Sequence, residues 1–285
     1  MKAPFRTLAA GVAVAFGLLT ATASRADFAF GVTFLGNQLI TIDTTTGAGT
    51  LVGPLSTPIS PFGLSDVGGK LYTFDSNADV IRQLNPSTGG TLASFNIGVG
   101  PVLGQGGLAF QNSTVGFLTS ALDPTTLAPV NNLFRFDIST GMSTLVAHTA
   151  DTLEALAFAP GGTLYGLGKN DGNLFTIDTT TGAMMLVGNV GVTVGSPTGG
   201  LAFGPDGSLF ATLDDVLYKL NLTTGAATLV NPDTTGNVVT DAGFSSISGL
   251  AFGPAAVPEP SSIVLCGVFA AVAGGYRMVR RPRVA

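Results

Sequence analysis

Acidic side chains are the main candidates for chemistry in this sequence. Asp151 and Glu154 stand just before an apolar segment, and Asp214 and Asp215 are adjacent between two further apolar segments. Two carboxyl groups, one protonated and one ionised, form the usual catalytic pair for cleaving a glycosidic bond. These four residues are therefore the candidates for a glycan-cleaving site. Residues of this type between apolar segments are also typical of turns, and we favour that interpretation.

Other catalytic and ligand-binding motifs are missing from the sequence. His148 is the single histidine, so no histidine cluster can bind zinc, and we interpret it as a surface side chain. There is no Gly-x-Ser-x-Gly elbow and no P-loop, and the glycines at 98–107 lack dinucleotide-binding spacing. The sequence therefore predicts no catalytic residue and no cofactor. It also predicts no metal site, although residues 170–173 (Asn-Asp-Gly-Asn) are the best alternative for calcium.

The middle of the chain is an internal repeat. The phrase Asp/Asn-x-x-Thr-Gly begins at five positions, Asp43, Asn85, Asp137, Asp178 and Asn221, which are 42, 52, 41 and 43 residues apart. A second phrase, Leu-Ala-Phe, begins at Leu108, Leu156, Leu201 and Leu250, and a degenerate copy begins at Phe62. A period of about 40 to 50 residues is typical of one four-stranded propeller blade.

Turn residues divide each repeat into short antiparallel strands. In one repeat we expect strands at 201–203, 208–212, 216–222 and 226–230. Gly204-Pro205-Asp206-Gly207 supplies proline, whose ring fixes φ at the value a turn needs, and glycine where φ is positive. The repeated Asp and Asn side chains are expected to accept hydrogen bonds from backbone amides two or three residues later. Turn capping is therefore the favoured role of these residues over metal binding.

The two ends of the repeat region complement one another. Residues 28–53 supply only the last three strands of a repeat, and residues 247–252 supply only one Leu-Ala-Phe strand. Together they make one complete sheet, which would close a ring and remove its free edge. Residues 27–256 are therefore predicted to form an all-β propeller of about five four-stranded blades. An open β-solenoid or a sandwich is the alternative, and the repeat pattern over about 28–254 resembles bacterial extracellular β-propellers.

The charge of this region excludes a large class of partners. Between Asp27 and Asp241 there are five basic and sixteen acidic side chains, a net charge of −11. Such a segment repels the phosphate backbone of nucleic acids and has no basic stripe to offset the repulsion. We therefore expect no nucleic-acid partner.

The N-terminal segment, 1–26, is typical of a secretory signal peptide. Lys2 and Arg6 precede an apolar run at 8–19, and small residues follow. Cleavage is predicted after Ala26, with Ala23 as the second choice. A first core helix is the alternative interpretation.

The C-terminal segment, 257–285, has three parts. The first is Val257-Pro258-Glu259-Pro260, the second is an apolar run at 263–276, and the third is a basic end with Arg277, Arg280, Arg281 and Arg283. The run is short for a bilayer span, but flanking serines and a snorkelling arginine could extend the helix. The arginines predict a cytoplasmic C-terminus and would stop translocation. This arrangement resembles the PEP-CTERM sorting signal of Gram-negative bacteria that produce exopolysaccharides.

The resemblance implies processing partners and a destination. Signal peptidase would remove the N-terminal segment, and an exosortase would cut at the Val257–Pro260 motif after transient membrane insertion. The precursor would be anchored in the inner membrane, and the product would reach the cell surface or the extracellular matrix of a biofilm. A plain C-terminal membrane anchor is the alternative. Cys266 lies in the apolar run, so an exported product has no internal disulfide.

Three functions remain open at this point. The favoured one is a non-enzymatic binding or structural propeller, with a polysaccharide or a matrix protein as its ligand class. The alternatives are an extracellular glycan hydrolase or lyase that uses Asp151, Glu154 or Asp214, and a membrane-anchored periplasmic scaffold.

Overall fold

The computed structural model describes residues 28–56, 59–99, 106–123, 129–169, 171–192, 199–230 and 243–253. These ranges form five four-stranded antiparallel sheets, the blades. Blade 1 contains β20 (Ile247–Ala251), β1 (Phe28–Thr33), β2 (Gln38–Asp43) and β3 (Gly49–Pro54). Blade 2 contains β4 (Pro61–Val67), β5 (Lys70–Asp75), β6 (Val80–Leu84) and β7 (Thr91–Asn96). Blade 3 contains β8 (Leu108–Phe110), β9 (Val115–Leu122), β10 (Pro129–Asp137) and β11 (Met142–His148). Blade 4 contains β12 (Leu153–Phe158), β13 (Leu164–Gly168), β14 (Asn173–Ile177) and β15 (Met184–Asn189). Blade 5 contains β16 (Gly199–Phe203), β17 (Leu209–Leu213), β18 (Val216–Leu220) and β19 (Ala227–Leu229).

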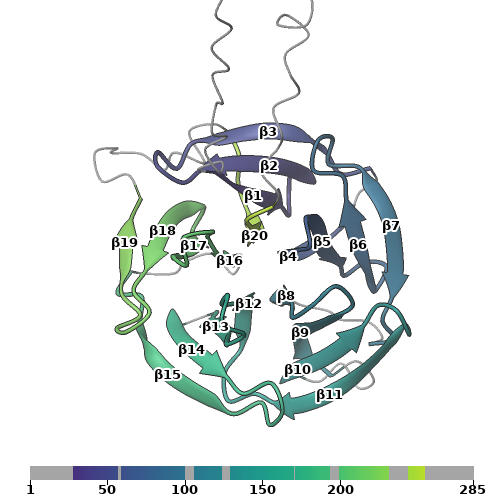
Figure 1. Cartoon of the computed structure of the whole chain (residues 1–285), viewed down its shortest axis with the longest axis vertical. Helices are drawn as coiled ribbons and strands as arrows, with labels where there is room; N and C mark the ends of the chain where they lie inside the picture. The colour runs from purple at the N-terminus through teal and green to yellow at the C-terminus, as the bar shows by residue number, and fades with distance from the viewer. Residues whose placement is uncertain are drawn as a thin grey trace, which may run out of the picture.

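The blades surround a central axis, and the innermost strands are β20, β4, β8, β12 and β16 (Figure 1). The predicted five-bladed propeller is therefore confirmed, and the Leu-Ala-Phe phrases lie in, or at the end of, the innermost strands. The four strands predicted in blade 5 agree with β16 to β19 within two residues at each end. The longest interval between the repeated turns, the one before Asp137, contains a long link between β7 and β8 and the two longest described strands, β9 and β10, with eight and nine residues.

Closure of the ring follows the predicted scheme. β20 pairs with β1 in antiparallel register, with Phe30 opposite Ala251 and Gly31 opposite Leu250. The last described strand thus completes the sheet that the first three strands begin, so blade 1 has four strands like the others and the ring is closed. This pairing excludes the open solenoid.

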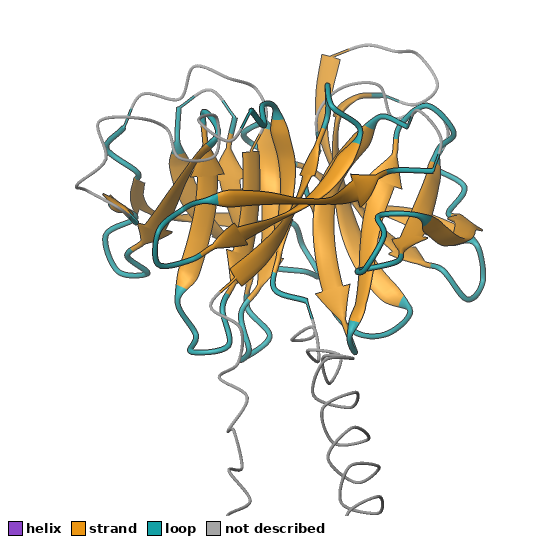
Figure 2. Ribbon diagram, turned by 90° about the horizontal axis from the view of Figure 1, so that it is seen from above, coloured by secondary structure: helices purple, strands orange, loops and turns teal. Residues whose placement is uncertain are grey.

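The two faces of the ring carry different connections (Figure 2). The face that we call the connection face carries the links between blades, such as 149–152, and the hairpins between second and third strands, such as 214–215. The opposite, terminal face carries the start of β1 at Phe28, the end of β20 at Ala251 and the Asp/Asn-x-x-Thr-Gly turns. Both ends of the described chain therefore leave the ring on the terminal face.

The repeated turns are capped as predicted. The Asp178 carboxylate accepts hydrogen bonds from the amides of Thr180 and Thr181, both at 2.8 Å, and Gly182 follows at φ 71°. The Asp43 carboxylate accepts the amides of Thr45 and Thr46 in the same way. These bonds favour the charged carboxylate and lower the pKa of Asp178. Turn capping thus accounts for these side chains without a metal ion.

Aromatic pairs connect consecutive blades. The phenylalanine that ends each Leu-Ala-Phe phrase packs against an aromatic ring on the second strand of the preceding blade, with ring centroids 4.6 to 5.8 Å apart. The four pairs are Phe110 with Tyr72, Phe158 with Phe117, Phe203 with Tyr165, and Phe252 with Phe210. Each such pair adds about 1 kcal/mol beyond the area that it buries.

The middle of the central channel is closed. A ring of leucines, including Leu64, Leu156 and Leu250, fills it, and no space for a water molecule remains there. Glycines allow the inner strands to approach this closely. A Cβ atom on Gly200 would lie 2.5 Å from the backbone nitrogen of Leu250, and one on Gly249 would lie 2.5 Å from that of Leu64.

Several sequence predictions lie outside the described residues. These are the signal peptide with Ala26, the sorting motif with Pro258 and Glu259, the apolar run with Cys266, and the terminal arginines. Within the described ranges, no helix is long and apolar enough to cross a membrane.

Candidate functional site

The predicted carboxylates Asp151, Glu154 and Asp214 all lie on the connection face. Asp151 is in the link that precedes β12, Glu154 is the second residue of β12, and Asp214 is in the β17–β18 hairpin. Blades 4 and 5 are neighbours in the ring, so these residues belong to one sector of this face, which we call the acidic mouth (Figure 1). Lys169, which follows β13, is the basic residue of this sector.

Glu154 is the most unusual group of the acidic mouth. Its side chain is 2% exposed, and neither carboxyl oxygen has a hydrogen-bond partner. Burial raises its pKa from 4.5 to about 8, an effect that Lys169 opposes and Asp214 reinforces. Its Oε1 occupies space beside Gly199, where a Cβ atom would lie only 2.9 Å away. A pKa of about 8 keeps most Glu154 side chains protonated at pH 7, so this group could serve as a proton donor.

Asp75, another buried carboxyl group, shows how unusual the lack of hydrogen-bond partners at Glu154 is. Asp75 is 1% exposed, but Arg82 pairs with its carboxylate at 2.7 Å, and the amides of Ser60 and Asn77 donate to it. An isolated buried carboxyl group carries a desolvation cost that such partners offset. Glu154 bears that cost, which is why it is the leading functional candidate of the acidic mouth.

Asp151 forms a carboxyl pair with Asp171 in the same sector. Burial raises the pKa of Asp151, and a shared hydrogen bond with Asp171 and the charge of Asp171 raise it further. Asp171 also forms hydrogen bonds of its own, because its carboxylate accepts one from the backbone amide of Asn173 and one from the Asn173 side chain.

In the predicted alternative for calcium, residues 170–173, residue 170 lies outside the described residues. The described part of the chain contains no cluster of three or more Asp, Glu, His or Cys side chains suited to a metal ion.

Asp214 and Asp215 are adjacent in one hairpin turn but have different roles. Both residues have positive φ values, 49° and 63°, as a two-residue hairpin turn between twisted strands requires. The Asp215 carboxylate accepts the amides of Ser246 and Ile247 at 2.9 and 2.7 Å, so it holds the start of the closing strand β20. Asp215 is therefore structural, whereas Asp214 contributes to the field at Glu154.

His148 does not belong to the acidic mouth. It ends the outermost strand of blade 3, is exposed, and its Nδ1 lies 2.8 Å from Oδ1 of the buried Asn132. This agrees with its interpretation as a surface side chain.

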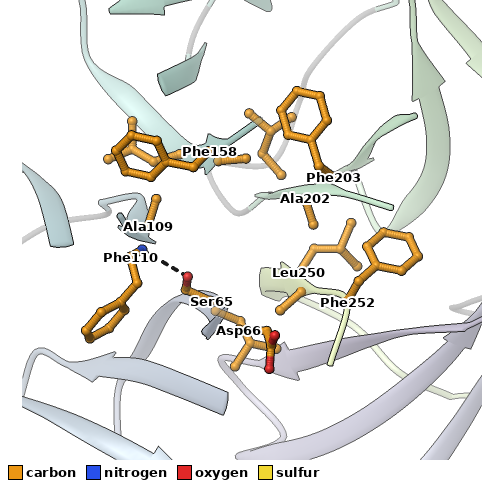
Figure 3. Close-up of a pocket in the computed structure, with 14 residues that line it drawn as sticks. Ser65, Asp66, Ala109, Phe110, Phe158, Ala202, Phe203, Leu250 and Phe252 are labelled. Atoms are coloured by element: carbon orange, nitrogen blue, oxygen red, sulfur yellow. Dashed lines mark hydrogen bonds between the residues drawn. The ribbon is translucent and has the colours of Figure 1, made fainter. Parts of the chain in front are cut away.

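Sequence reasoning missed Asp66, at the opposite end of the channel. The inner strands align as Gly/Ala-Leu-Ala-Phe, and in β4 this phrase is Gly63-Leu64-Ser65-Asp66, so the degenerate copy is offset from the one expected at Phe62. Asp66 thus occupies the position of the four phenylalanines. It lines a cavity of about 90 Å³ on the terminal face (Figure 3). Aligning the copies on their central leucine would have shown the substitution.

Burial of Asp66 also makes its ionised form energetically unfavourable. Its Oδ2 is buried without a hydrogen-bond partner, and burial raises its pKa to about 6, opposed by the Gly69 amide. The neighbouring Ser65 hydroxyl accepts the amide of Phe110 at 3.0 Å and so joins blades 2 and 3. Ser65 therefore has a structural role between blades, while the Asp66 carboxyl group interacts with the Gly69 amide and keeps Oδ2 buried without a partner.

Comparisons with known proteins give the fold and no family. No family model matches the chain, and no curated protein matches it. Among solved structures, a chain of the nidogen/laminin complex is 10% identical with a TM-score of 0.50, covering 79% of this chain and 80% of that one. A gluconolactonase from Xanthomonas campestris is 13% identical with a TM-score of 0.48, covering 74% and 78%. Both identities are too low to transfer an activity to this chain.

Proposed function

We propose that this chain is an exported, exosortase-sorted propeller that acts as a non-enzymatic binding or structural protein of the cell surface or extracellular matrix. Its tripartite C-terminus supplies the address, and its rigid ring supplies the binding surfaces. Signal peptidase and exosortase would be its processing partners, and a polysaccharide or matrix protein its ligand.

The position of the chain ends carries this proposal. β1 begins at Phe28, directly after the predicted cut at Ala26, and β20 ends at Ala251, before the predicted cut near Glu259. Both cuts would therefore leave every strand and the ring closure in place. Both ends lie on the terminal face, so a membrane-held precursor would expose the acidic mouth on the opposite face (Figure 2).

Mass spectrometry of the protein from its native host tests this function. The released protein should begin near Asp27 and end near Glu259, and Pro258→Ala with Glu259→Ala should retain the tail and keep the protein on the cells. Pro282→Ala, beyond the motif, is the matched control and should still be released. Peptides from 267–277 in the released fraction would refute processing, and a tail retained on all molecules would favour a membrane-anchored scaffold.

One observation favours a second candidate function, an extracellular glycan hydrolase or lyase. Glu154 is a buried, protonated carboxyl group beside the charge of Asp214, which is the division of roles that glycosidic cleavage requires. Turnover on a polysaccharide panel that Glu154→Gln abolishes and Asp206→Asn leaves intact would establish it. Turnover that survives Glu154→Gln would exclude Glu154 as its proton donor.

A further inference from the structure

A second hollow lies at the seam where blade 5 meets blade 1. It has a volume of about 530 Å³, and we call it the seam groove. The residues that line it include Thr44, Thr45, Phe210, Lys219, Asn221 and Thr228. Thr44 and Thr45 come from the capped turn of blade 1, and the other four residues come from β17 to β19 and the start of the next turn.

Strand register aligns one wall of the groove. Phe210 pairs with Lys219 across β17 and β18, and Lys219 pairs with Thr228 across β18 and β19. Directly paired residues in an antiparallel sheet place their side chains on the same face. The row therefore runs from a ring through an ammonium group to a hydroxyl group. The Lys219 Nζ lies 5.9 Å from the centre of the Phe210 ring.

Lys219 makes this groove unusual in an acidic molecule. It is one of five basic residues between Asp27 and Asp241, against sixteen acids. Its side chain is 54% exposed, and its contact with Asp206 is long, 4.0 Å between Nζ and Oδ2, with Asp206 itself 62% exposed. Such an exposed pair contributes little energy, so Lys219 can exchange Asp206 for another anion at small cost.

The remaining polar groups suit hydroxyl-rich ligands. Thr45 of blade 1 and Thr228 of blade 5 are both exposed, and both line the groove. The carboxylate of Asp43 is held by the amides of its own turn, so it does not oppose an anion as a free charge would. The amide oxygen of Asn221 is likewise used in its turn, which leaves its NH₂ group as the donor toward a ligand.

We propose that the seam groove binds a saccharide unit that carries a carboxylate, such as a uronic acid residue of a matrix polysaccharide. The volume lies within the range of small-molecule sites, and the apolar wall with a few polar groups is their usual composition. Lys219 would pair with the carboxylate, the hydroxyl and amide groups would bind sugar hydroxyls, and the half-buried Leu229 and Val230 would contact the C–H face. This proposal rests on the polysaccharide-binding function proposed above.

Calorimetric titration of the full chain with uronic acid trimers tests the proposal. The probes are galacturonate, glucuronate and mannuronate trimers, and their methyl esters, which lack the charge, are the controls. At least one acid should bind, with its ester at least tenfold weaker. Lys219→Gln should weaken binding of the acid at least tenfold, and Lys70→Gln, at an exposed position at the start of β5 in blade 2, should leave the affinity unchanged.

A variant that fills the groove tests the proposal independently of the charge of Lys219. Thr45→Trp, in an exposed turn position, should abolish binding while the melting temperature stays within a few degrees of the wild type. Absence of binding to every trimer at millimolar concentration would overturn the proposal, as would equal affinity for acid and ester or full affinity in Lys219→Gln. A protein that is released from cells with its tail removed but binds none of the trimers would refute this inference and leave the sorting function standing.

Discussion

At the scale of single residues, three buried acids show how neighbours determine the state of a carboxyl group. Asp75 has Arg82 and two amides and is fully paired, whereas Glu154 and Asp66 have carboxyl oxygens without partners. The pKa of Glu154 rises to about 8 and that of Asp66 to about 6, because burial disfavours the charge. The sequence could suggest Glu154 from its place before an inner strand, but its lack of a partner is a property of the packed ring.

The stability of the propeller should therefore fall as the pH rises. In the unfolded chain Glu154 ionises near 4.5, but in the folded chain it keeps its proton until about pH 8. Between these values the folded state binds the extra proton, so stability is lost with rising pH, by on the order of 5 kcal/mol in total. Glu154→Gln should flatten the dependence of the melting temperature on pH from 5 to 8.5. Asp66 adds a slope of the same sign only between about pH 4 and pH 6, and the variant keeps that part. Parallel profiles for the two proteins would contradict this account.

Replacing Asp66 should stabilise the ring at neutral pH. Asp66→Phe restores the Gly-Leu-Ala/Ser-Phe pattern of the inner strands and removes a costly carboxyl group. The partner ring of Phe110 is Tyr72, which pairs with Ser65 on the inner strand of blade 2. Phe30 on β1 pairs with Ala251 in the same way, so it is the ring that a phenylalanine at position 66 would meet. The variant should gain about 1–2 kcal/mol in urea unfolding at pH 7. Asp66→Asn, which removes the charge without adding a ring, should gain less. A loss of stability in both variants would show that the carboxyl group has a structural role.

At the scale of elements, the inner strands combine leucines that close the channel with glycines that allow the strands to meet. The period of the repeat and the turn residues made the strands predictable, because both are local properties of the sequence. The role of these glycines was not predictable in the same way. Gly200 and Gly249 resemble any turn glycine in a glycine-rich chain, and their constraint comes from Leu250 and Leu64 of other blades.

A pair of alanine substitutions distinguishes an inner-strand glycine from a turn glycine. In Gly200→Ala the new Cβ would lie 2.5 Å from the backbone nitrogen of Leu250, which no side-chain rotation can relieve. We expect a loss of about 3 kcal/mol in urea unfolding, at the upper end for overpacking. Gly161→Ala, in the β12–β13 turn with no heavy atom within 4 Å of the new Cβ, should stay within about 0.5 kcal/mol. Equal effects of the two substitutions would mean that the inner strands are not in close contact.

At the scale of the whole molecule, closure joins the most distant parts of the described chain. β1 and β20 are the first and last described strands, yet they lie side by side in blade 1. The Ser248 hydroxyl donates to the Pro61 carbonyl at 2.5 Å, and Asp215 holds the start of β20 by two amides, so blades 1, 2 and 5 are coupled here. The complementary strand counts of the two ends made this closure predictable. The seam groove was not, because it depends on how blades 1 and 5 pack.

Truncation at the closing strand tests this coupling. A chain that ends at Gly243 lacks β20 and would expose the ladder of β1 along residues 30–33 together with buried Leu64 and Phe210. Burial of apolar surface contributes about 25 cal/mol per Å², so losing five fully buried residues should lower the melting temperature by well over ten degrees. A chain that ends at Gly253 keeps β20 and is the matched control, with a melting temperature close to that of the full chain. If both truncated chains melted together, the pairing of β20 with β1 would not be what closes the ring. A low melting temperature for the shorter chain alone, with strand content retained in circular dichroism in the cold, would identify β20 as the strand that holds an otherwise assembled ring closed.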